Sequence, residues 1–101
     1  MSKKLLPPLV EVCQQISQDD AAKMLGWSDR TLQTFLNTKQ YDLAEEWRWM
    51  KGIVYFQGSD RGNLTYNRYV LSMWQIARSQ NDVSIYLNAI SLFQSVVKQV
   101  G

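Results

Sequence analysis

The sequence predicts a mainly α-helical fold with one small β-hairpin and a long C-terminal helix. Apolar residues recur at helical spacing along most of the chain. One β-branched and aromatic run, at residues 53–57, is followed by a glycine-rich turn, which is typical of a hairpin. The last stretch, residues 83–99, keeps an unbroken helical pattern. The chain of 101 residues is short enough for one domain, which we place at 1–101.

Capping residues divide the first part of the chain into short helices. Pro8 suits the first turn of a helix over residues 8–16. Ser17 is a good N-cap for a second helix, which runs to about Leu25 and is ended by Gly26. Ser28 is a good N-cap for a third helix over residues 29–38. Two short helices joined by three residues with a glycine are a helix-turn-helix signature, here at about 17–38.

The second part of the chain continues with the hairpin and two longer helices. Residues 41–50 predict a short helix, or a helix that runs into a strand. The hairpin pairs 53–57 with 64–66 across the turn at 58–63, so we expect a β-wing at about 52–66. Asn67 and Asp82 are suitable caps for helices over 68–80 and 83–99, which together make the C-terminal helices at about 68–99.

Residue usage argues against an enzyme. The chain has no histidine and only one cysteine, so histidine-assisted nucleophiles, histidine metal sites and thiolate clusters are not expected. The paired acids 19–20 and 45–46 fit a helix start and a solvent face better than acid–base catalysis. We therefore predict no cofactor and no metal. The lone cysteine and the lack of a leader or membrane span favour the cytoplasm.

Charge is unevenly distributed along the chain. Residues 9–46 hold seven acids against three bases, whereas residues 47–78 hold five bases against one acid. A basic second half favours an anionic partner such as nucleic acid, although a solvated charged face would look the same.

The order of these elements resembles a known family. The stretch Ala22-x-x-Leu25-Gly26-Trp27-Ser28-x-x-Thr31-Leu32-x-x-Phe35-Leu36, followed by a hairpin and Tyr66-Asn67-Arg68, is similar to the winged helix-turn-helix DNA-binding domain of the MerR and excisionase type. The resemblance covers about residues 17–78. It implies a small non-enzymatic protein that binds duplex DNA, as a transcriptional regulator or a recombination accessory factor.

The resemblance also implies site residues. The helix at 29–38 would enter the major groove with its outward polar side chains, which are Arg30, Thr31, Gln33 and Thr34. Phosphate contacts would come from the basic residues on and after this helix, which are Lys39, Arg48, Lys51, Arg61 and Arg68.

An alternative interpretation is a protein–protein adaptor or assembly factor that keeps the scaffold without binding DNA. Exposed aromatic residues would then meet a protein partner, and Trp27, Trp49 and Tyr41 are the candidates. Simple filling of the core is the competing explanation for these aromatic residues.

The apolar pattern of the C-terminal helix predicts that two chains pair as a homodimer. Its apolar residues repeat with heptad spacing at Val83, Tyr86, Ile90, Phe93 and Val97. A MerR-type protein would pair through such a helix to match a two-fold DNA site. The same stripe could instead cover the core of its own chain.

Overall fold

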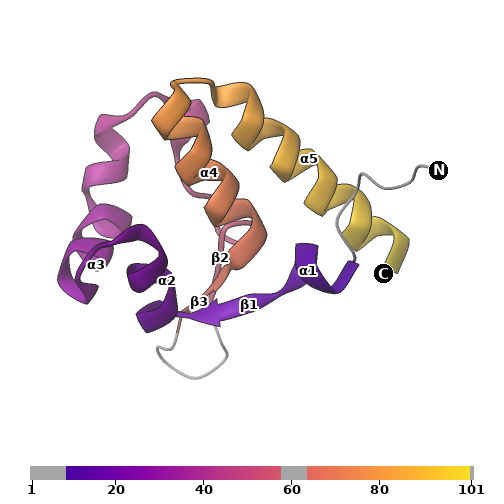
Figure 1. Cartoon of the computed structure of the whole chain (residues 1–101), viewed down its shortest axis with the longest axis horizontal. Coiled ribbons are helices and arrows are strands. Elements are labelled where there is room, and N and C mark those ends of the chain that lie inside the picture. Colours follow the sequence, from indigo (N-terminus) through magenta and orange to yellow (C-terminus); the bar gives the residue numbers. More distant parts are fainter. Residues whose placement is uncertain (1–8, 58–63, 101) are drawn as a thin grey trace.

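The computed structural model describes residues 9–57 and 64–100, and Figure 1 shows their arrangement. The mainly α-helical fold with a small hairpin and a long C-terminal helix is confirmed. The described residues form five α-helices: α1 (Leu9–Cys13), α2 (Gln18–Leu25), α3 (Asp29–Asn37), α4 (Arg68–Gln80) and α5 (Val83–Val100). Helices α2 and α3 lie at one end of the molecule, and α5 extends toward the other.

A three-stranded antiparallel sheet joins the two ends. Its strands are β1 (Gln15–Ser17), β2 (Tyr55–Gln57) and β3 (Leu64–Asn67), in the order β1-β3-β2. The predicted hairpin is present, with Tyr55 opposite Tyr66. The helix predicted over 8–16 is too long, because it ends at Cys13 and residues 15–17 instead pair with β3. Arg61 and the turn at 58–63 lie outside the described residues.

The predicted helix caps are confirmed. The backbone N–H of Asp20 donates to Ser17 Oγ at 3.1 Å, and that of Thr31 donates to Ser28 Oγ at 3.1 Å. Gly26 ends α2 at a φ of 76°, a left-handed conformation that favours glycine. Gly26 and Ser28 together fix the three-residue turn between α2 and α3.

The segment after α3 differs from its prediction. Residues 41–50 form no α-helix; two 3-10 turns, η1 (Lys39–Asp42) and η2 (Glu45–Trp47), lead into an extended stretch. The reason lies in Gln40, whose buried side chain bridges two backbone groups. Its Nε2 donates to the Leu36 carbonyl at 2.7 Å, and its Oε1 accepts from the Trp49 N–H at 2.7 Å. This bridge holds the chain against the end of α3.

Helices α4 and α5 pack against each other and enclose the core. Three of the five predicted dimer residues, Tyr86, Ile90 and Phe93, are buried within the chain at 0–7% exposure. The assignment of these three to a dimer interface is therefore wrong, because the stripe covers the core of its own chain. Val83 is half-buried and Val97 is exposed. Pairing of two chains stays a prediction that would need other surfaces.

Within residues 9–57 and 64–100, no helix is both long enough and apolar enough to span a bilayer. The same residues hold no cluster of three or more His, Cys, Asp or Glu side chains suited to a metal ion.

Candidate nucleic-acid interface

Helix α3 has one face in the core and one in solvent. Leu32 is fully buried and Leu36 nearly so, which anchors the helix to the rest of the domain. The remaining face is polar and exposed, as the sequence predicts. Its exposed side chains include Arg30, Thr31, Gln33 and Thr34. A helix held by its apolar side presents such a face rigidly, which suits contact with a groove of DNA.

A hollow of about 450 Å³ opens on this face. Arg30, Thr31 and Thr34 line it from α3, and Lys39 lines it from the turn that follows. Four of the predicted DNA-binding residues therefore share one surface. Trp27 and Phe35 supply its apolar lining. The Thr31 hydroxyl accepts a hydrogen bond from Ser28 Oγ at 3.0 Å, which fixes the rotamer of that side chain.

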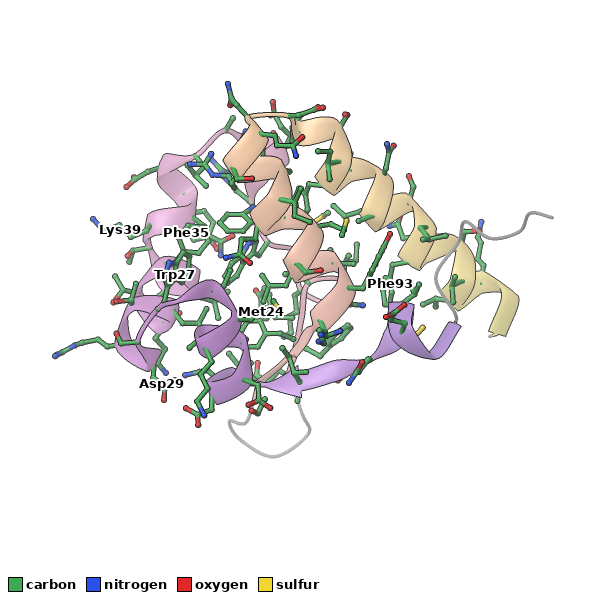
Figure 2. All side chains as sticks on the ribbon, viewed as in Figure 1. Met24, Trp27, Asp29, Phe35, Lys39 and Phe93 are labelled. Carbon is green, nitrogen blue, oxygen red and sulfur yellow. The ribbon has the colours of Figure 1, made fainter. Side chains whose placement is uncertain are left out.

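The apolar lining of the hollow is backed by an aromatic cluster. The ring centroids of Trp27 and Phe35 lie 5.3 Å apart. Trp49 stacks behind Trp27 with centroids 6.2 Å apart, and it lies 4.6 Å from Phe35. Trp74 of α4 meets Phe35 edge-on at 5.4 Å. Figure 2 shows Trp27, Phe35 and Lys39 together at the α3 end of the molecule, far from Phe93.

A second hollow of about 410 Å³ shares Trp27 and Phe35 with the first. It extends toward α4 and is lined there by Trp74 and Arg78, with Leu43 from the loop after α3. The Arg78 guanidinium carbon lies 6.0 Å from the centroid of Trp74 and 5.0 Å from that of Trp47. A cation is therefore placed on aromatic faces beside the shared wall.

Within the part of the chain that the structure describes, the other predicted DNA-binding residues do not line the first hollow. Gln33 is exposed elsewhere on α3, and Lys51 and Arg68 are exposed on the loop before β2 and at the start of α4. Arg48 is half-buried and partly engaged by its own chain. Its Nε and Nη2 donate to the carbonyls of Leu43 and Tyr41 at 3.3 and 3.4 Å, and its guanidinium lies over the Tyr41 ring. This geometry limits Arg48 as a phosphate ligand.

The predicted aromatic candidates for protein contact fall into different environments. Trp49 is only 4% exposed, so its proposed exposure was wrong; it fills the core between α3 and the sheet. Trp27 is half-buried and Tyr41 is exposed. Phe35 and Arg78 also line these hollows, and neither is among the site residues predicted from the sequence. Arg78 follows Trp74 by four positions on α4, which places both on one helix face and could have indicated it.

Comparison of this chain with protein-family models, curated proteins and solved structures gave no match.

Proposed function

We propose that this chain is a small non-enzymatic DNA-binding protein that contacts duplex DNA through the exposed face of α3. The observation that best supports this proposal is the hollow lined by Arg30, Thr31, Thr34 and Lys39. Two cations and two hydroxyls on one rigid helix and its C-terminal turn provide both phosphate contacts and donors for base edges. A role in transcription regulation or recombination fits this proposal.

The position of the hairpin supports the same proposal. Strands β2 and β3 belong to the sheet whose other edge, β1, leads directly into α2. The hairpin therefore has a fixed relation to the two helices, as a DNA-binding wing requires. Asp29, at the start of α3, would repel phosphate, so we expect the backbone contacts to concentrate on Arg30 and Lys39.

A salt titration of duplex binding tests the proposal. Fluorescence anisotropy would be followed with a pool of random 25-base-pair duplexes from low to moderate salt. Each neutralised phosphate contributes about −0.9 to the slope of log K against log salt. Arg30→Gln should weaken binding and flatten that slope by about one unit.

Lys98→Gln is the matched control, since Lys98 is an exposed cation near the end of α5, at the other end of the molecule from α3. It should leave the slope within error. If no duplex binds even at low salt, the DNA proposal fails and the adaptor interpretation becomes the better one. Equal effects of both variants would indicate a general charge effect instead of an interface on α3.

A further inference from the structure

Trp27 and Phe35 form a wall common to both hollows, and we call these two residues the aromatic ledge. Both side chains are half-buried, so each packs on the core while keeping part of its surface in solvent. Trp27 comes from the turn before α3 and Phe35 from the second turn of α3. The ledge is therefore part of the same face that we propose for DNA.

Cations surround the aromatic ledge. Arg30 and Lys39 line the hollow on one side, and Arg78 lines the hollow on the other. No described residue that lines either hollow is an aspartate or a glutamate. The whole chain has 11 basic and 9 acidic residues, so this surface departs locally from a nearly balanced composition.

Aromatic faces between cations are the recognition chemistry of unpaired nucleotides. Bases stack on exposed aromatic side chains, while the neighbouring cations follow the phosphates. An intact duplex cannot use the ledge in this way, because its bases are stacked on one another.

We infer that the aromatic ledge binds an unpaired base of DNA, with Arg30, Lys39 and Arg78 holding the adjoining phosphates. The inference rests on the proposal that this face binds DNA. It adds that the face prefers DNA with unpaired bases, as at a melted site or a single-stranded end.

The ledge is prepared for such stacking. Trp49 lies behind Trp27 with an interplanar angle of 19°, and Trp74 meets Trp27 edge-on at 6.3 Å. These contacts hold the ring before any ligand arrives, which lowers the entropy cost of binding. Each hollow, at about 450 and 410 Å³, lies within the range of small-ligand sites and can admit a base.

The test compares single-stranded and duplex DNA on tryptophan variants. The probes are a labelled 12-nucleotide oligothymidine and a labelled duplex of mixed sequence, both measured by anisotropy at fixed low salt. Trp27→Leu keeps an apolar side chain but removes the aromatic face. It should weaken single-strand binding by about 5- to 150-fold, the range for one lost stacking contact. Duplex affinity should change by less than about twofold.

Tyr69→Leu is the matched control, because Tyr69 is also a half-buried aromatic residue that packs on the core, but it lines neither hollow. It should leave both affinities unchanged. Trp27→Phe, which restores an aromatic face, should recover most of the single-strand affinity. A 2-aminopurine base in the strand should be quenched by the wild type and much less by Trp27→Leu.

The outcomes separate this inference from the duplex proposal. The inference is overturned if Trp27→Leu spares single-strand binding, if it weakens both probes equally, or if Tyr69→Leu acts as strongly. If duplex binding is absent but single-strand binding depends on Trp27, the duplex proposal fails and the inference stands. Arg30→Gln should weaken binding of both probes, since both present phosphates.

Discussion

Two buried tyrosines differ in whether their hydroxyl group has a hydrogen-bond partner. The Tyr86 hydroxyl donates to the Arg48 carbonyl at 2.7 Å. The Tyr66 hydroxyl is buried, and no described residue forms a hydrogen bond with it. Burial, followed by the charge of Tyr55, raises the pKa of Tyr66 to about 12. Burial alone raises the pKa of Tyr86.

We expect opposite outcomes when each hydroxyl is removed. Tyr86→Phe should lower the free energy of unfolding by about 0.5–1.5 kcal/mol, because the carbonyl of the half-buried Arg48 loses its hydrogen-bond donor. Tyr66→Phe should be neutral or slightly stabilising, because a buried polar group without a partner disappears. Urea denaturation at pH 7 measures both changes. Equal destabilisation by the two variants would contradict the difference in hydrogen bonding.

The raised pKa values of these two tyrosines also lead us to expect that the free energy of unfolding falls at high pH. A folded pKa above the unfolded value of 10.0 means that the neutral form is favoured by folding. The corresponding stability is complete below pH 10 and is lost as the pH rises toward 12. In urea denaturation repeated between pH 10 and 12, Tyr66→Phe should therefore lose less stability than the wild type.

At the scale of elements, the joint between α3 and the following segment depends on Gln40. Its amide makes one hydrogen bond to the end of α3 and one to the Trp49 backbone, and the side chain is 1% exposed. Gln40→Leu removes both bonds and leaves two buried backbone groups unpaired. We expect a loss of about 2–4 kcal/mol, and Gln33→Leu on the exposed face of the same helix should change stability by about 0.5 kcal/mol or less.

Gln40→Glu tests the two hydrogen bonds of Gln40 more specifically, because its ability to form them depends on pH. A protonated glutamic acid can donate to the Leu36 carbonyl and accept from the Trp49 N–H, as the amide does. The ionised form has no donor and is buried, so its folded pKa should rise above the unfolded value of about 4.3. The variant should match the wild type near pH 4 and lose stability as the pH rises through the folded pKa. A constant difference from the wild type between pH 4 and 7 would contradict the bridge.

Local chemistry predicts some elements of this fold and misses others. Ser17, Ser28 and Asn67 identify helix starts because each cap bonds to a backbone N–H three residues on. Strand β1 has no such local signal. It is three residues long, and its pairing depends on β3, about fifty positions away. The segment at 41–50 follows helical spacing, yet its conformation is decided by the Gln40 bridge to Trp49.

The candidate site also has one part that can be predicted from the sequence and one part that cannot. The exposed polar face of α3 follows from the spacing of Leu32 and Leu36, so Arg30, Thr31 and Thr34 can be placed from the sequence alone. The aromatic ledge cannot be placed in this way, because a half-buried aromatic residue has the same periodicity as a core residue. Arg78 joins the site only through the packing of α4 beside α3, which is a tertiary contact.

At the scale of the whole molecule, α5 is a cover for the core of its own chain. Periodicity identifies its apolar stripe but not what the stripe packs against. The described part of α5 has Tyr86, Ile90 and Phe93 inside the core, with Val97 46% exposed toward its end. Figure 1 shows α5 spanning from α4 toward α1, and both helices pack against it. The helix therefore completes the domain.

Substitutions at Ile90 and Val97 separate a core role from a dimer seam. Ile90→Glu buries an unpaired charge in the core and should cost several kcal/mol, comparable with the stability of a small domain, so that this variant does not fold. Val97→Glu places the same charge in solvent and should change the free energy of unfolding by about 0.5 kcal/mol or less. Thermal melting and light scattering at tens of micromolar measure stability and mass together. If the stripe were a dimer interface instead, Ile90→Glu would still fold, and Val97→Glu would reduce the mass from dimer to monomer. The reason is that a charge introduced into an interface between chains weakens association before it weakens the fold.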